Sequence, residues 1–343
     1  SGVFKYCCPL KLSYQWTGNC PAIPYGTYIQ PLAVILKDTT TMRKMSMKKI
    51  IFLSIIMISC ASTYTNSEKI IGYNLRKPDL SLIMPDTLRE VSGLAIIDSS
   101  TFVCIQDENG ILFFYDSENN KIKNQFTFHI NGDYEGITKV DNSVYILRSD
   151  GLLFEIANYL DSNSKITSYQ TGIPANNNEG LCYDKNNHRL LIACKGKIGK
   201  GPEFKDKRVI YGFDLTDKTL TKEPVYNFDI QNIKEFAIRN KLDLPTKTRK
   251  KKGQEISEPF IKFRTSAICI HPKTKQLFLL SASDYLLFIY DTNGTLIHLE
   301  QLNPKIFNKA EGISFFDNGD MLITNEGQDK RPTVLRFNYR MKE

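Results

Sequence analysis

The sequence predicts an all-β protein, a β-propeller of five blades with four antiparallel strands in each. A short phrase carries most of this prediction: Glu or Ser, then a small residue, then an aliphatic one. It occurs five times, and the residues that open it are Ser92, Glu135, Glu179, Ser266 and Glu311. The intervals are 43, 44, 87 and 45 residues, and a period near 44 is typical of four-stranded propeller blades.

A second observation is the order of signals after each phrase. A turn rich in Asn, Asp and Gly comes first, and short apolar runs follow it, which is the pattern of successive β-hairpins. The predicted second strands cover 144–148, 189–194, 277–281 and 321–325. The 17 Tyr and 20 Phe residues agree with a chain built from strands.

The interval of 87 residues allows a sixth blade, which is the alternative. The content of this interval favours five blades. Residues 223–230 supply the fourth strand of the third unit, and 231–262 contain a helical pattern followed by a polar loop rather than four strands. We therefore expect five blades with one helical and basic insertion at 231–262.

The last unit ends after about three strands, near Tyr339, whereas residues 70–86 contain strand-like runs before the first unit. An N-terminal strand is therefore expected to complete the last blade. Closing the ring in this way removes exposed sheet edges.

The segment "MKKIIFLSIIMISC" at 47–60 has a basic start, a short apolar run and a small residue before Cys60. These features describe a secretory signal, and Met-Ile-Ser-Cys resembles a bacterial lipobox, in which the Cys becomes the lipidated first residue. The alternatives are a buried strand or an ordinary signal with an incidental Cys.

The prediction divides the chain into an upstream extension (1–46), a lipoprotein signal peptide (47–59), an anchor linker (60–69) and the propeller (70–343). Membrane attachment through Cys60 places the protein in the cell envelope. Ala61 is not the acidic residue that often retains lipoproteins at the inner membrane, which favours the outer membrane.

The net charge of +8 does not indicate a nucleic-acid partner. Residues 1–59 contribute +6 of it, and residues 60–343 carry 38 basic and 36 acidic groups. The insertion holds nine Lys/Arg and four acids, with a "KTRKKK" run. This run is expected to be a solvated loop, with contact to phosphate groups or anionic lipid as the alternative.

The glutamates of the phrase open the first strand of their blades, and the first strand of each blade lines the central channel. Glu135, Glu179 and Glu311 are therefore expected to meet at one mouth. Clustered carboxylates repel one another unless a proton or a cation neutralises them, and Ca²⁺ prefers such oxygen ligands.

More polar residues stand where the second strands end, and these are expected at the same mouth. Asp107 and Glu326 join the predicted metal ligands, and the remaining polar positions are Ser92, Gln106, Glu108, Arg148, Lys195, Ser281 and Asn325. Arg148 and Lys195 also allow the alternative of a structural ion-pair network that neutralises the glutamates.

The phrases "EVSGLAIID", "VCIQDENGILFFYD", "GDYEGITKVDNSVYIL", "NNEGLCYDKNNHRLLIACKGK" and "AEGISFFDNGDMLITNEG" make the chain similar to the SdiA-regulated, YjiK/CarP-type bacterial β-propellers over about 72–340. This resemblance implies a cell-envelope propeller with a link to calcium, and a looser similarity to phytase-like and esterase-like propellers. It carries a site role to Glu135, Glu179, Glu311, Asp107 and Glu326 by motif position. Arg148 stands where an acidic residue is expected.

Three functions remain open from the sequence. The first is a lipid-anchored propeller that binds Ca²⁺ or a small ligand at its channel mouth without catalysis. The second is a metal-dependent hydrolase, a phytase-like phosphoesterase or a lactonase. The third is a scaffold for an envelope protein or a glycan, because propellers host many functions.

Overall fold

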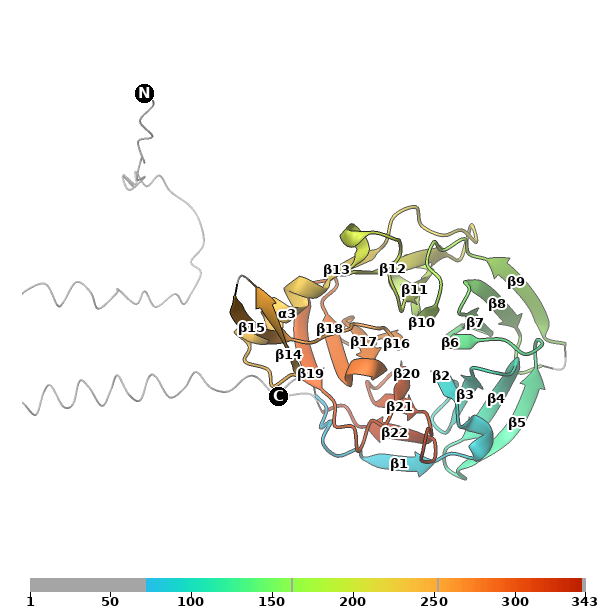
Figure 1. The fold of residues 1–343 in the computed structure, drawn as a ribbon. Helices are drawn as coiled ribbons and strands as arrows, with labels where there is room; N and C mark the ends of the chain where they lie inside the picture. Colours follow the sequence, from blue (N-terminus) through green and yellow to red (C-terminus); the bar gives the residue numbers. More distant parts are fainter. Residues whose placement is uncertain (1–71, 162, 252, 341–343) are drawn as a thin grey trace, which may run out of the picture. The chain divides into compact units, whose positions relative to one another are not determined.

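The computed structural model describes residues 72–161, 163–251 and 253–340, and these form a five-bladed β-propeller (Figure 1). Each blade is a four-stranded antiparallel sheet, as predicted. The predicted signal peptide 47–59, Cys60 and the linker 60–69 lie outside the described residues. No helix in the described part of the chain is long and apolar enough to cross a membrane.

The strands follow one another from the channel outward. Blade 1 contains β2 (Val91–Ile96), β3 (Thr101–Gln106), β4 (Ile111–Asp116) and β5 (Lys121–Thr127). Blade 2 contains β6 (Tyr134–Val140), β7 (Ser143–Arg148), β8 (Leu152–Ala157) and β9 (Lys165–Gln170). Blade 3 contains β10 (Asn178–Asp184), β11 (Arg189–Cys194), β12 (Lys207–Asp214) and β13 (Tyr226–Asp229).

Blade 4 follows the insertion, and blade 5 contains both ends of the propeller. Blade 4 contains β16 (Ala267–Ile270), β17 (Leu277–Ser281), β18 (Leu286–Tyr290) and β19 (Leu296–Gln301). Blade 5 contains β20 (Ala310–Phe315), β21 (Met321–Asn325), β22 (Thr333–Phe337) and β1 (Leu80–Ile83). Short 3₁₀ turns occur at Asp86–Leu88, Lys185–Asn187, Pro202–Phe204 and Ala282–Asp284.

The N-terminal strand closes the ring, which confirms the prediction. β1 pairs antiparallel with β22, with Leu80 opposite Arg336 and Ile83 opposite Thr333. Arg340 adds an ion pair of 2.8 Å to Asp79. The two ends of the propeller therefore stabilise one sheet, and opening that sheet would expose both of them.

The core consists of five apolar clusters, and each one lies between two neighbouring blades. The cluster between blades 1 and 2, for example, packs Val103 and Leu112 against Val144 and Phe154, all buried. The other four clusters join blades 2 and 3, 3 and 4, 4 and 5, and 5 and 1. Because apolar burial is the main favourable term in folding, each blade is stabilised by its neighbours.

Close packing around the channel explains the small residue of the repeated phrase. A Cβ atom on Gly136 would lie 2.7 Å from the carbonyl oxygen of Glu179 and 2.8 Å from Cβ of Leu181 in the next blade. Gly93 meets Ile137 of the next blade in the same way, and Gly180 meets Ile268. The aliphatic residue of the phrase in one blade therefore packs against the small residue of the phrase in the preceding blade.

The insertion differs from its prediction in one part. Helix α3 (Ile230–Arg239) is present, capped by Asp229, whose side chain accepts a hydrogen bond from the N–H of Gln231. The predicted polar loop is wrong: β14 (Thr246–Lys251) and β15 (Gln254–Pro259) form a hairpin. Alternating Thr and Lys in β14 suit a two-stranded ribbon with solvent on both faces, and composition alone did not distinguish this ribbon from a loop.

Candidate functional site

A β-bulge places the first residue of the repeated phrase. The register between the first and second strands shifts between Val91 and Gly93, and the equivalent shift occurs in blades 2, 3 and 5. The extra residues are Ser92, Glu135, Glu179 and Glu311. A bulged residue is left out of the ladder and its side chain is re-aimed. The bulge therefore lets a polar side chain leave the apolar packing between blades.

The bulged residues meet at the channel axis. Together with Ser266 of blade 4 they line a cavity of about 10 Å³, which is room for about one water molecule. Each blade contributes one of these residues: Ser92, Glu135, Glu179, Ser266 and Glu311. The structure thus brings together the three glutamates that were predicted to meet. Their role as metal ligands stays a prediction.

A second set of residues lies close to the bulged ones. In four blades the same backbone hydrogen bond joins the residue just after the second strand to the residue two positions before the bulge. The N–H of Asp107, just after β3, donates to the carbonyl oxygen of Glu90, two residues before the bulged Ser92, at 3.2 Å. The N–H of Glu326 donates to the carbonyl oxygen of Lys309 at 2.9 Å in blade 5. The corresponding pairs are Ser149 with Asp133, and Lys195 with Asn177. We call these residues and the bulged ones together the acidic mouth.

Three carboxylates of the acidic mouth form a tight group. Glu90 and Asp107 of blade 1 and Glu326 of blade 5 offer carboxylate oxygens that lie within 4.8 Å of one another. Sequence reasoning found Asp107 and Glu326 but missed Glu90. An available signal was its place two residues before Ser92, which corresponds to the place of Asp133 before Glu135.

Two lysines provide the nearby positive charge. Lys195 forms an ion pair with Glu179, and Lys309 lies with its Nζ 2.6 Å from Glu326 and 3.4 Å from Glu311. Lys195 was predicted at the mouth, whereas Lys309 was not. Part of the alternative ion-pair network is therefore present.

Four other predicted residues are engaged elsewhere. Arg148 forms two hydrogen bonds to Asp150, at 2.9 and 2.7 Å, rather than an ion pair with a mouth glutamate. Gln106 accepts the N–H of Glu108, Ser281 donates to Asp284 at 2.7 Å, and Asn325 donates to the Ile306 carbonyl oxygen at 3.2 Å. Their polar side chains hold turns and loops, and Glu108 itself is exposed.

Burial and like charge raise the pKa of the carboxyl groups in the mouth. Burial, followed by repulsion from neighbouring carboxylates, raises the pKa of Glu135 to about 9. Burial and Glu311 raise the pKa of Glu179 to about 8, against the lowering effect of Lys195. The pKa of Glu326 rises to about 7 and that of Asp107 to about 6, in both cases with burial as the main cause.

The charge balance explains these directions. Within the described residues, eight acids lie in or beside the mouth and influence one another: Glu90, Asp107, Glu108, Asp133, Glu135, Glu179, Glu311 and Glu326. Lys195 and Lys309 are the lysines that pair with them. In addition, Oδ1 of Asp107 is buried and has no hydrogen-bond partner in the described part of the chain. Among the described residues, the acids of the mouth therefore outnumber the lysines that pair with them.

The ligand chemistry of the three-carboxylate group is that of a hard cation. Oxygen ligands suit Ca²⁺, Mg²⁺ and Mn²⁺, whereas softer ions prefer thiolate or imidazole. The group supplies three carboxylates, and one of them, that of Asp107, has a buried oxygen with no hydrogen-bond partner among the described residues. These residues therefore fit a divalent cation of this class.

The opposite end of the channel differs in chemistry. It opens into a cavity of about 180 Å³, in which Lys139 is the charged lining residue. Five aliphatic residues line both this cavity and the small one at the acidic mouth: Leu94, Ile137, Leu181, Ile268 and Ile313. They separate a mouth rich in carboxylates from one without them.

No protein-family model matches the chain, and no curated protein matches it. Solved structures similar to it are propellers. Glutaminyl cyclase from Myxococcus xanthus is 14% identical, with 78% of this chain and 97% of that chain covered and a TM-score of 0.49. The WD40 β-propeller domain of Doa1 is 11% identical, with 78% and 98% covered and a TM-score of 0.42.

A streptogramin B lyase is also similar in structure, at 11% identity, with 74% of this chain and 84% of that chain covered and a TM-score of 0.41. These similarities do not identify the SdiA-regulated family, so membership in it stays a prediction.

Proposed function

We propose that the acidic mouth binds a divalent cation, with Ca²⁺ the ion it fits best, in a propeller attached to the cell envelope through lipidated Cys60. The single observation that carries the cation proposal is the approach of Glu90, Asp107 and Glu326 to within 4.8 Å of one another. These residues are the proposed ligands. Glu135, Glu179 and Glu311 add negative potential beside them.

The proposal explains why the mouth keeps so many carboxylates. Two unit charges about 5 Å apart interact by about 3 kcal/mol at an effective dielectric constant of about 20, so uncompensated carboxylates in one mouth are costly. Without a cation, the raised pKa values of Glu135 and Glu179 mean that protons supply the compensation at neutral pH. A divalent cation would supply it without protonation.

The proposed site would leave part of the cation uncovered. Ca²⁺ takes about six to eight oxygen ligands, more than three carboxylates provide. Water or an anionic group of a small ligand would complete the shell. Because the cation would keep open coordination positions, one site could bind both Ca²⁺ and a small ligand, the two ligands expected from the sequence.

Isothermal titration calorimetry of residues 67–343 with Ca²⁺, Mg²⁺ and Zn²⁺ tests the proposal. We expect Ca²⁺ to release or absorb heat and to raise the melting temperature. Asp107→Asn and Glu326→Gln should each weaken the affinity at least about tenfold, which corresponds to about 1.4 kcal/mol. The matched control is Glu118→Gln, at an exposed acid in the turn between β4 and β5, which should bind as the wild type does. Absence of heat and of a thermal shift with every ion would contradict the proposal.

A metal-dependent hydrolase is the second candidate, and the raised pKa of Glu135 favours it. A carboxyl group whose pKa is raised to about 9 is a stronger base than an ordinary carboxylate, and once a cation has displaced its proton it can accept a proton from an attacking water. Purified protein should then turn over phosphate esters or lactones in the presence of Ca²⁺. Loss of turnover in Glu135→Gln would support this candidate, and inactivity across a broad panel would exclude it.

The membrane anchor is a separate proposal with its own test. Cells that express the protein should incorporate labelled fatty acid into it, and Cys60→Ser should abolish the label and release the protein from membranes washed at high salt. Equal labelling of the Cys60→Ser variant would contradict the anchor.

A further inference from the structure

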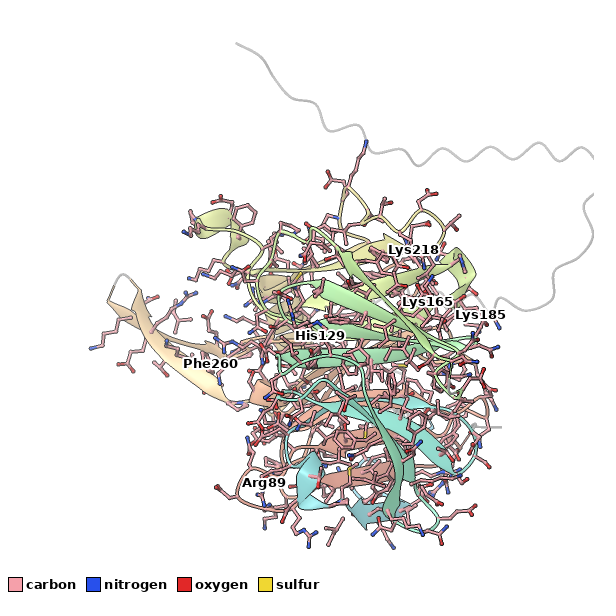
Figure 2. All side chains as sticks on the ribbon, turned by 90° about the vertical axis from the view of Figure 1, so that its right-hand side faces the viewer. Arg89, His129, Lys165, Lys185, Lys218 and Phe260 are labelled. Atoms are coloured by element: carbon pink, nitrogen blue, oxygen red, sulfur yellow. The ribbon has the colours of Figure 1, made fainter. Side chains whose placement is uncertain are left out.

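The insertion forms an arm at the outer edge of blades 3 and 4, where α3 contacts β13 and β19. We define the arm as helix α3 and the hairpin β14–β15, residues 230–260. It leaves blade 3 at the end of β13 and returns at the start of β16, as the other connections between blades do, and those connections carry the acidic mouth. Figure 2 shows the hairpin extending beyond the ring on the side of Arg89 and Phe260, whereas Lys165 and Lys185 lie on the opposite side.

The hairpin is strongly basic. Residues 247–252 contain five Lys/Arg, and the returning strand adds Glu255 and Glu258. Glu258 is occupied by ion pairs with Arg249 at 3.0 Å and Lys234 of α3 at 3.4 Å. The basic residues of the hairpin therefore outnumber its acids by five to two.

Exposed apolar side chains lie within this basic surface. Ile238 is 59% exposed, Phe260 42% and Ile256 37%. Register places Ile256 opposite Arg249, and Nζ of Lys247 lies 5.8 Å from the centre of the Phe260 ring. Ile256 and Phe260 each stand two residues along the chain from Glu258, and Ile238 stands four residues from Lys234, the ion-pair partner of Glu258.

The helix contributes to the same surface. Residues four apart lie on one face of a helix, so Ile238 lies next to Lys234, which reaches Glu258 of β15. The buried face of α3 is a different one, formed by Ile230, Ile233 and Ala237. Ile238 is therefore not needed for packing the arm onto the ring.

We propose that the arm docks on the surface of an anionic phospholipid bilayer. Lys247 and Arg249 would contact the headgroup phosphates, and Ile238, Ile256 and Phe260 would enter the boundary between headgroups and acyl chains. Basic residues beside exposed aromatic and aliphatic ones are the pattern of interfacial binding. A nucleic acid would use the charges but leave the three apolar side chains in water.

Co-sedimentation of residues 67–343, one compact unit, with phospholipid vesicles tests this proposal. We expect binding to vesicles of phosphatidylcholine and phosphatidylglycerol in equal parts, little binding to phosphatidylcholine alone, and release at high salt. The double variant Lys247→Glu/Arg249→Glu removes four units of charge and should lower the partition coefficient by at least about a hundredfold. Phe260→Ser should lower it by about tenfold at unchanged charge.

The matched control is Lys165→Glu/Lys185→Glu, an equal change of charge on the opposite side, which should leave binding unchanged. The milder double variant Lys247→Gln/Arg249→Gln keeps polar side chains beside Glu258 and should weaken binding by about tenfold. The proposal is overturned if both pairs of reversals weaken binding equally. It is also overturned if binding is lost in Asp107→Asn but kept in Lys247→Glu/Arg249→Glu, since the contact would then belong to the acidic mouth.

Discussion

Blades 1 and 4 hold a serine at the position where blades 2, 3 and 5 hold a glutamate. The hydroxyl of Ser92 donates to the carbonyl oxygen of Tyr134 at 2.6 Å, and that of Ser266 donates to the carbonyl oxygen of Ala310 at 2.8 Å. Each serine thereby joins its blade to the first strand of the next. A buried hydroxyl that donates in this way has its hydrogen-bonding need met.

The glutamates at this position do something else. Glu179 and Glu311 are buried and pair with Lys195 and Lys309. Burying a carboxylate costs folding free energy even when it is paired. A serine at this position joins two blades by a hydrogen bond with a smaller desolvation cost. The difference indicates that the glutamates are present for their charge or their proton, and that the ring does not need them.

The largest expected effect is that of placing a glutamate where the ring uses a serine. Ser266→Glu buries a carboxylate at a position that is 3% exposed and removes the hydrogen bond to Ala310. We expect the free energy of unfolding to fall by about 4 kcal/mol, measured by urea denaturation. Ser283→Glu, at an exposed neighbouring position, should change it by less than about 0.5 kcal/mol. A Ser266→Glu variant as stable as the wild type would show that the mouth accepts a further carboxylate without cost.

A smaller effect is expected from pH. The folded-state pKa values of Glu135 and Glu179 lie at about 9 and 8, above their usual value near 4.5. The folded protein therefore holds more protons than the unfolded chain, and this stability is fully present below about pH 4.5 and lost as pH rises toward 9. Each proton that the folded protein retains lowers the free energy of unfolding by about 1.4 kcal/mol for every pH unit of increase, which per pH unit is smaller than the effect of Ser266→Glu.

The measurement is the free energy of unfolding between pH 5 and pH 9 in chelator and in saturating Ca²⁺. We expect it to fall with pH in chelator and to fall less in Ca²⁺, because the cation replaces the protons. Glu135→Gln/Glu179→Gln should flatten the dependence in chelator. Stability that rises over this range would contradict the raised pKa values.

The smallest effect concerns the residue after the serine or glutamate. Gly136→Ala would bring a Cβ within 2.7 Å of a backbone oxygen, so we expect a loss of about 2 kcal/mol. Blade 4 has Ala267 at this position, and Ala267→Gly should cost at most about 1 kcal/mol. Gly196→Ala is the control, because nothing lies within 4 Å of its added Cβ. Equal losses for Gly136→Ala and Gly196→Ala would refute the proposed contact between blades.

The five blades and the closure of the ring could be predicted because the repeated phrase forms the same contact between neighbouring blades each time it occurs. Gly136 and Ile137 are fixed by blade-to-blade packing, so the phrase returns with the blade. The hairpin β14–β15 belongs to no repeat, and its polar residues suit a loop as well as a ribbon. Its structure therefore had no signal of this kind in the sequence.

The site was predictable in part for the same reason. Glu135, Glu179 and Glu311 stand in the phrase itself, whereas Glu90 and Lys309 stand two residues before it, at a position where each blade has a different residue type. The side-chain direction of Arg148 depends on Asp150, a local partner in a turn. Spacing along the chain identifies which residues reach the mouth, and competition among neighbours decides which of them face it.

An anomalous-scattering map of crystals soaked with Mn²⁺ or a lanthanide tests the central claim most directly. The account predicts a single strong peak in the acidic mouth, about 2.4 Å from carboxylate oxygens of Glu90, Asp107 and Glu326. A mouth without a peak, with these carboxyl groups hydrogen-bonded only to Lys309, water or one another, would contradict it.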